Sequence, residues 1–313
     1  MRMKNRVASL ALSLLMTSTA ALADLKVGVS MAQFDDNWLT YLRESMADKA
    51  KSMPDGVQLQ FEDARSDVVK QINQVQSFIS QKVDAIIVNP VDTAATRNIT
   101  EAATKAGIPL VYVNRRPDEK TLPEGVVVVA SNDLEAGRLQ MQYLADKMGG
   151  KGNLVIMLGD LANNSTQNRT KGVKEVLAKY PDIKVVEEQT GNYMRDKGMD
   201  LMSNWLLSGR EFDAVVSNND EMAIGAAMAL QQSGKNKGSV LIGGVDGTPD
   251  GLAAVQRGML AVSVFQDAKG QANGAVEAAV KMAKNEPVEQ NVWIPYEQIT
   301  ADNVTSFQAR LKQ

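Results

Sequence analysis

The chain has 313 residues, with 34 basic and 37 acidic side chains and neither cysteine nor histidine. Without these two residue types, disulfides, thiolate or histidine metal sites, and Ser-His-Asp or Cys-His catalysis are excluded. The chain is mildly acidic and lacks the basic face that nucleic-acid binding needs, and its sequence contains no glycine-rich phosphate-binding motif. We therefore expect no nucleic-acid partner, no metal site and no cofactor.

The first 23 residues have the layout of a secretory signal. Arg2, Lys4 and Arg6 precede an apolar stretch at 7–16, and small residues close the segment. The apolar run is shorter than the roughly 20 residues that span a bilayer. We expect residues 1–23 to be a cleaved signal peptide and the mature chain to be periplasmic.

The first half of the mature chain alternates short β-branched runs with amphipathic helical stretches. This alternation is typical of βαβ units on a parallel sheet. The predicted strands are 25–30, 57–61, 85–88, 110–113 and 126–130.

A predicted helix at 133–148 leads into a second set of the same kind. Its strands are expected at 154–158, 184–188, 214–217, 240–245 and 261–265. Two such sets predict an α/β protein with two doubly wound parallel-sheet lobes.

No long flexible linker separates the two sets, so the chain must pass tightly between the lobes. We expect crossings near 130–131, 263–265 and 293–295, which would form a multi-strand hinge that permits closure about a ligand. The predicted N-terminal lobe is then 24–130 plus 266–293. The predicted C-terminal lobe is 131–265 plus 294–313.

Polar residues follow almost every predicted strand. Ligands of open α/β sheets bind beyond the carboxyl ends of the strands. Carboxylate, amide and guanidinium groups supply the donors and acceptors that a ligand with several hydroxyls needs, and Phe34, Trp38 or Tyr193 could cover its C–H face. The polar segments are 34–38, 89–92, 114–116, 163–169, 192–193, 218–220, 246–248 and 266–267.

Each of these residues also has an ordinary structural interpretation. Acidic and amide residues ahead of a helix are commonly N-caps, and this is what we expect of Asn89, Asp92, Asp133 and Asp220. Core packing could account for Trp38. Surface ion pairs could account for the arginines at 115 and 169, and for Asn114 beside the first of them.

Two stretches carry a family resemblance that extends over essentially the whole mature chain. They are NNDEMAIGAAMALQQSGK at 218–235 and IGGVDGTPDGLAAVQRG at 242–258. The chain resembles periplasmic binding proteins of the ribose-binding type, the type I substrate-binding proteins of ABC importers. The resemblance implies a binding protein without catalytic residues that closes its lobes on a small molecule.

The resemblance also implies a set of ligand-binding residues. Asp36 corresponds to a hydroxyl partner and Trp38 to a stacking ring, while Asn114 and Arg115 stand where sugar binders of this family have Asp-Arg. Arg169 matches the family arginine by its spacing to Gly172. The predicted ligand-binding set is Phe34, Asp36, Trp38, Asn114, Arg115, Arg169, Tyr193, Asn219, Asp246 and Gln266.

Within the family, FDDNWLTYLRESM at 34–46 and VNRRP at 113–117 look most like members that bind myo-inositol and rhizopine compounds. We therefore expect a cyclitol ligand, myo-inositol first. The alternative is a pentose or hexose such as ribose or galactose, for transport or chemotaxis.

The resemblance implies the membrane permease of an ABC importer as partner and a monomeric chain, and a chemoreceptor is left open as a second partner. The sequence disfavours two other classes of protein. A sugar-responsive repressor would need a DNA-binding head where the signal stands. A glycoside hydrolase would need two facing carboxylates, and the adjacent Asp35 and Asp36 are poorly placed for that.

Overall fold

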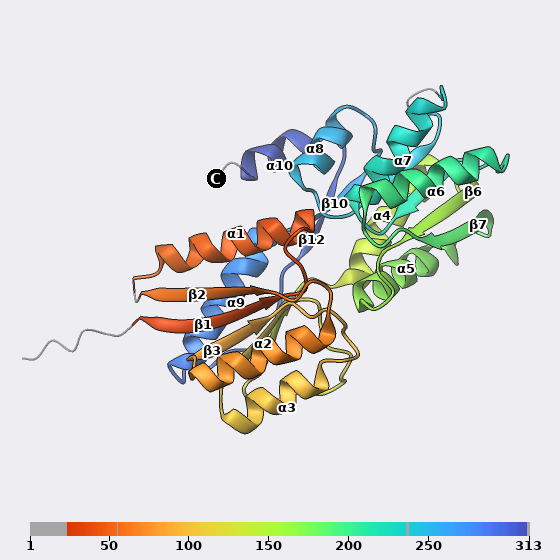
Figure 1. Ribbon diagram of the computed structural model, residues 1–313. Helices are drawn as coiled ribbons and strands as arrows, with labels where there is room; N and C mark the ends of the chain where they lie inside the picture. Colours follow the sequence, from red (N-terminus) through yellow and green to blue (C-terminus); the bar gives the residue numbers. More distant parts are fainter. Residues whose placement is uncertain (1–23, 55, 236–237, 312–313) are drawn as a thin grey trace, which may run out of the picture.

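The computed structural model describes residues 24–54, 56–235 and 238–311, so the predicted signal peptide lies outside the described residues. The described chain forms two lobes, each an α/β layer structure (Figure 1). Within those ranges, none of the helices has the length and apolar character needed to cross a bilayer.

The N-terminal lobe is built on a six-stranded, all-parallel sheet. Its strand order is β11-β5-β4-β3-β1-β2. The predicted strands of the first set are all present, and one late strand joins them at the edge. The strands are β1 (Leu25–Met31), β2 (Val57–Asp63), β3 (Ala85–Val88), β4 (Leu110–Asn114), β5 (Val126–Ala130) and β11 (Asn291–Trp293).

Helices cover both faces of this sheet, so its central strands are buried runs of Val and Ile. α1 (Asn37–Ser52) and α9 (Ala268–Ala283) lie side by side on one face (Figure 1). α2 (Val68–Gln81) and α3 (Arg97–Ala106) pack on the other. The two helix pairs bury separate cores against opposite faces.

The C-terminal lobe repeats this plan around a four-stranded parallel sheet of order β7-β6-β8-β9. α4 and α5 bury one face of the sheet, and α6, α7, α8 and α10 bury the other. The strands are β6 (Lys151–Leu158), β7 (Asp182–Thr190), β8 (Ala214–Ser217) and β9 (Leu241–Gly243). The helices are α4 (Asp133–Lys147), α5 (Asn164–Leu177), α6 (Arg195–Leu207), α7 (Asp220–Gln232), α8 (Pro249–Gln256) and α10 (Val304–Arg310).

The last strand of the second set has an antiparallel partner that the prediction did not include. β10 (Ser263–Gln266) pairs antiparallel with β12 (Tyr296–Ile299). Isolated parallel bridges join Gly243 to Val262 and Asp246 to Phe265, so the strand also runs parallel to the end of β9 and the residues after it, as predicted. The pair with β12 is antiparallel because β10 runs out of the C-terminal lobe while β12 returns into it.

Three chain segments connect the lobes. They lie between β5 and α4, between β10 and α9, and between β11 and β12. These connections fall at or next to the predicted crossings. The lobe boundaries at 130/131, 265/266 and 293/294 stay a prediction. The three connecting segments together form the hinge between the lobes.

Candidate ligand-binding site

The loops at the carboxyl ends of both sheets enclose a narrow cavity of about 30 Å³. It adjoins a wider cleft of about 690 Å³, which shares Asp36, Arg115 and Tyr193 with it. The cavity lining comes from both lobes and from the hinge. It comprises Asp36, Trp38, Leu39, Asn114, Arg115, Asn163, Ser165, Arg169, Tyr193, Asn219, Asp246 and Gln266.

Nine of the ten predicted ligand-binding residues line this cavity. Phe34 is the one that the lining leaves out. Its ring packs under the Arg43 guanidinium, with 4.2 Å from the Arg43 Cζ to the ring centroid. Its carbonyl accepts hydrogen bonds from the Thr40 hydroxyl and from Arg43. Phe34 thus supports the start of α1, and ligand contact stays a prediction for all ten residues.

The start of α1 places an acceptor and an aromatic ring in the cavity, from its N-cap Asp36 and its second residue Trp38. The Asp36 carboxylate caps α1 by accepting a 2.8 Å bond from the Leu39 N–H. Burial raises the pKa of this carboxyl, against the lowering effects of the Leu39 bond and the Arg115 charge. Trp38 is buried, and its indole Nε1 donates to the Gln266 carbonyl at 3.2 Å. The indole is therefore held against the hinge.

The amide of Asn114 is oriented by a buried neighbour. Asn89 Oδ1 accepts from the Ala32 N–H, so Asn89 Nδ2 must donate, and it bonds Asn114 Oδ1 at 3.2 Å. This contact uses the Asn114 oxygen and leaves its Nδ2 as the group to offer a ligand. Asn114 has φ of 68°, a left-handed conformation that Asn tolerates better than most residues.

Arg115 extends this donor surface. Its Nη1 donates to the Pro90 carbonyl at 2.8 Å. Its buried Nε has no hydrogen-bond partner among the described residues. A ligand oxygen would relieve that unpaired donor.

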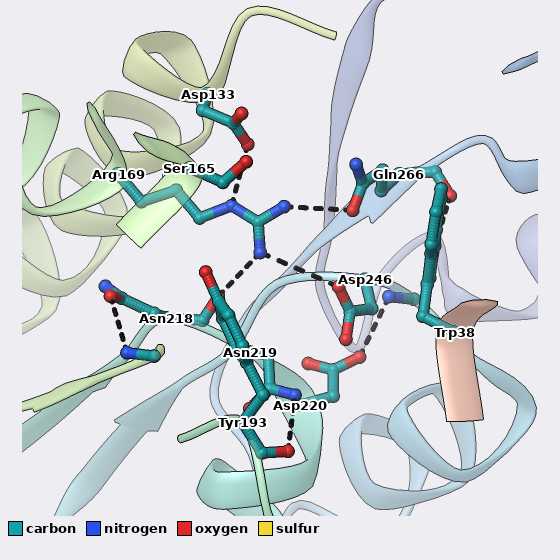
Figure 2. Close-up of polar contacts among 12 residues, drawn as sticks. Trp38, Asp133, Ser165, Arg169, Tyr193, Asn218, Asn219, Asp220, Asp246 and Gln266 are labelled. Carbon is teal, nitrogen blue, oxygen red and sulfur yellow. Dashed lines mark hydrogen bonds and ion pairs between the residues drawn. The ribbon is translucent and has the colours of Figure 1, made fainter. Parts of the chain in front are cut away.

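Arg169 is the centre of the C-terminal half of the cavity (Figure 2). It is only 4% exposed, so the surface ion pair considered from sequence is wrong. Its guanidinium donates to Asp133 Oδ1 at 2.8 Å, the Asn218 carbonyl at 2.7 Å, Gln266 Oε1 at 2.9 Å and the Tyr296 hydroxyl at 3.0 Å. Asp246 Oδ1 lies 3.7 Å from its Nη1. Arg169 therefore joins α4, α5, the hinge and the loop after β9.

Tyr193 and Asn219 fix one another on the opposite wall. The Tyr193 hydroxyl shares a 2.7 Å hydrogen bond with Thr166 Oγ1. Burial raises the pKa of this phenol to about 12, so it is neutral at physiological pH. Asn219 caps α7 through Met222 N–H and donates from Nδ2 to the Tyr193 carbonyl. Both groups are thereby preorganised.

The four residues predicted to be N-caps have other roles. Asp92 accepts from the Ala94 N–H in a turn, and Asn89 orients Asn114. Asp133 lies inside α4, whose N-cap is Asn132, and accepts from Arg169 and the Tyr296 hydroxyl. Asp220 accepts from Gly247 N–H and Ser263 Oγ. Asn89, Asp133 and Asp220 are buried and each has a distant partner beside the site, whereas Asp92 has a local partner two residues away.

Sequence reasoning omitted part of the lining and its support. Asn163 and Ser165 belong to a polar segment that follows β6, a signal that could have placed them. Asp133 and Tyr296 hold Arg169 from positions 36 and 127 residues away along the chain. Local pattern contains no signal for such long-range contacts.

Comparisons with known proteins agree with this geometry. A family model described as a periplasmic binding protein domain matches residues 27–287. A putative rhizopine-binding protein from Rhizobium meliloti is 50% identical, over 98% of this chain and 100% of the relative. A xylitol-binding protein from Mycolicibacterium smegmatis is 38% identical, over 91% of this chain and 80% of the relative.

One solved structure matches with a TM-score of 0.87 and 42% identity, covering 92% of this chain and 98% of the other. It is an ABC transporter solute-binding protein from Bacillus halodurans with bound myo-inositol. This solved structure shares the fold across 92% of the chain.

Proposed function

Since the chain belongs to the periplasmic binding protein family, we propose that it captures a cyclitol, myo-inositol first, and delivers it to the permease of an ABC importer. It is a sugar- or polyol-binding protein and not an enzyme. The observation that carries the proposal is the cavity itself, whose polar groups come from both lobes and converge on Arg169. Export through residues 1–23 is part of the proposal.

The chemistry of the cavity suits a ring with hydroxyls on every side. Each hydroxyl both donates and accepts, and the cavity offers acceptors on Asp36 and Asp246 and donors on Asn114, Arg115 and Arg169. Trp38 and Tyr193 can cover the C–H faces of such a ring. A ligand that lacks one hydroxyl would leave a buried polar group unpaired, so discrimination should be strong.

Asn114 favours a cyclitol over a reducing sugar. The hydroxyl on an anomeric carbon is a stronger donor than other ring hydroxyls, and a carboxylate suits it as an acceptor. Asn89 engages the Asn114 oxygen, so the group that remains for the ligand is a donor. A ring without an anomeric centre has ordinary hydroxyls that accept from this amide.

Contacts across the cleft support a closure mechanism. On one side Asn37 Nδ2 donates to Glu221 Oε1 at 2.9 Å. On the other, Asn164 Nδ2 donates to the Arg116 carbonyl at 2.7 Å and to Asp118 Oδ1 at 3.0 Å. A ligand that contacts both lobes binds this closed arrangement better than an open one, and that difference in affinity drives closure.

A thermal-shift screen tests the ligand class. The chain without residues 1–23 would be melted with myo-inositol, scyllo-inositol, xylitol, ribose, galactose and glucose. A ligand present at about 100 times its Kd adds about 2.7 kcal/mol to the unfolding free energy. We expect the inositols to raise Tm most. A shift with ribose or galactose alone would overturn the cyclitol proposal and leave the polyol-binding role intact.

Asn114→Asp tests the specificity argument. The carboxylate can still accept from Asn89 Nδ2, but it offers the ligand an acceptor and adds a negative charge beside Asp36. We expect the affinity for myo-inositol to fall about tenfold or more. Calorimetric titration measures it, with Asn285→Asp at an exposed turn as the control. Unchanged affinity in Asn114→Asp would contradict the role given to this amide.

Uptake and chemotaxis can be separated in cells. Deletion of the gene should abolish growth on the ligand if the protein serves an importer, whereas a chemotactic role alone would impair swimming toward the ligand and leave uptake normal. We propose uptake as the principal role, with a chemoreceptor as the alternative partner and a monomer as the working form.

A further inference from the structure

Asp220 is a buried carboxylate directly behind the cavity lining. It is the first residue of α7 and has no exposed surface. It does not line the cavity itself, but both of its oxygens are engaged. Ser263 Oγ donates to its Oδ1 at 2.7 Å, and Gly247 N–H donates to its Oδ2 at 2.8 Å. Asp220 thus joins α7 to β10 and to the loop after β9.

Hydrogen bonds of Asp220 hold the backbone on both sides of Asp246, which lies near it in Figure 2. Asp220 N–H donates to the Val245 carbonyl at 2.7 Å, and the Asp220 carboxylate accepts from Gly247, the residue after Asp246. β10 holds the other edge, because Asp246 N–H donates to the Val264 carbonyl. Such restraint is needed, since Asp246 has φ of 131°, a conformation that costs a non-glycine residue about 1–3 kcal/mol.

The fit around the Asp220 carboxylate is close. A Cβ on Gly244 would lie 2.1 Å from its Oδ1, and a Cβ on Gly251 would lie 2.0 Å from its Oδ2. Both approaches are shorter than van der Waals contact, so the two glycines are required by this carboxylate. The surrounding backbone therefore leaves just enough room for the Asp220 carboxylate, a side chain that the sequence predicted to be a helix N-cap.

We propose that Asp220 is a positioning residue for ligand binding, whose carboxylate clamps the loop at 245–247 so that the Asp246 side chain faces Arg169 and the cavity. The inference rests on the proposed contact of Asp246 with the ligand and holds for any polyol that uses it. Asp220 acts through Asp246 and does not touch the ligand.

The two carboxylates also interact electrostatically. The pKa of Asp220 is raised to about 7, chiefly by burial. The charge of Glu221 adds to this rise, while the bonds from Ser263 and Gly247 and the charge of Arg169 oppose it.

Burial likewise raises the pKa of Asp246 well above its usual range. The positive charge of Arg169 opposes this shift, whereas negative charges on Asp220, Asp36 and Glu221 add to it. Removing the Asp220 charge should therefore lower the pKa of Asp246. The ionised form of Asp246, which accepts from ligand hydroxyls, would then persist to lower pH.

Two substitutions separate the clamp from the charge. Asp220→Asn keeps an oxygen to accept from Gly247 and places an amide that can donate to Ser263 Oγ. Asp220→Ala removes both bonds. Asp213→Asn is the matched control, because Asp213 accepts a backbone N–H from Asn153 at the opposite end of the same sheet.

The affinity of each protein for myo-inositol would be measured by calorimetry from pH 4.5 to 8. At pH 7.5 we expect a loss of at least about tenfold in Asp220→Ala and a change below about threefold in Asp220→Asn. We also expect the acid limb of the affinity profile to move to lower pH in Asp220→Asn and to stay in place in the control. Wild-type affinity in Asp220→Ala, or an unmoved acid limb in Asp220→Asn, would overturn the proposal.

A ligand-free measurement keeps the test open if Asp220→Ala fails to fold. A folded-state pKa raised from 3.8 to about 7 gives stability that is present at low pH and is lost as pH rises through that range. Tm of the wild type should therefore decline more between pH 5 and 8 than Tm of Asp220→Asn. Parallel declines would count against the proposal. Failure of wild type to bind myo-inositol would overturn only the ligand choice, and the pH series would use the polyol found in the thermal-shift screen.

Discussion

Replacing Arg169 by methionine should abolish polyol binding and destabilise the protein. The substitution leaves the Gln266 amide oxygen and the Asn218 carbonyl without their donor in a buried site. It leaves the Asp133 carboxylate with the Tyr296 hydroxyl but without its cation. Removing one partner of a buried ion pair costs about 3–5 kcal/mol. The affinity should fall by more than about 100-fold, which corresponds to about 2.7 kcal/mol or two unpaired groups. Chemical denaturation and calorimetric titration measure the two effects.

The pH dependence of Arg169→Met gives a second readout. The Arg169 charge lowers the pKa of Asp246, so its removal raises that pKa further. A raised folded-state pKa adds stability at low pH that is lost as pH rises. The stability deficit of Arg169→Met should therefore shrink from pH 8 to pH 5.

Arg138→Met is the control for this prediction. Arg138 is half-exposed on α4 and pairs with Glu175 and Glu135. Exposed pairs contribute about 0–1 kcal/mol, so this variant should bind normally and lose little stability. Retained ligand affinity in Arg169→Met would mean that Arg169 is not at the centre of the binding site.

Replacing Asp246 by glycine should abolish binding without the usual cost in stability. Glycine adopts the φ of 131° freely, and its introduction removes a buried carboxylate that burial disfavours. We expect ligand affinity to fall by at least about 100-fold. In the ligand-free protein, we expect Asp246→Gly to be more stable than Asp246→Ala by about 1 kcal/mol or more.

Two controls define this result. Asp246→Ala should lose binding equally, since it also lacks the carboxylate, but it retains the backbone strain. Asn285→Gly relieves a positive φ at an exposed turn and should leave affinity unchanged. If Asp246→Gly melts at a lower temperature than Asp246→Ala, the backbone conformation of residue 246 does not destabilise the protein, and the prediction is wrong.

The central parallel strands of both lobes were predictable because they are buried on both faces. Residues 126–130 read Val-Val-Val-Val-Ala and are all buried, and such runs stand out against amphipathic helices. β12 carries Glu297 and Gln298 and pairs only with β10, so its pattern resembles a loop. Its existence depends on the return of the chain through the hinge, which no local pattern contains.

The candidate site was predictable where the fold brings strand ends together. It was less predictable where long-range contacts give a residue another role than its local sequence pattern indicates. Asn219 is the N-cap of α7 and also lines the cavity, so one side chain fills both roles. Asp133 and Asp220 fit the local pattern of a cap, but their partners lie on other elements. Phe34 was selected as a ring that could cover the C–H face of a ligand, and in the structure its ring packs against the Arg43 guanidinium.

Cyclitol binding is tested by calorimetric titration of the chain without its first 23 residues with myo-inositol, ribose and galactose. We expect a saturable 1:1 isotherm with myo-inositol and weaker or no heat with the two sugars. Silence with myo-inositol and a clear isotherm with ribose or galactose would contradict the proposed ligand. Silence with all three, in protein that melts cooperatively, would contradict the assignment of the cavity as a site for such polyols.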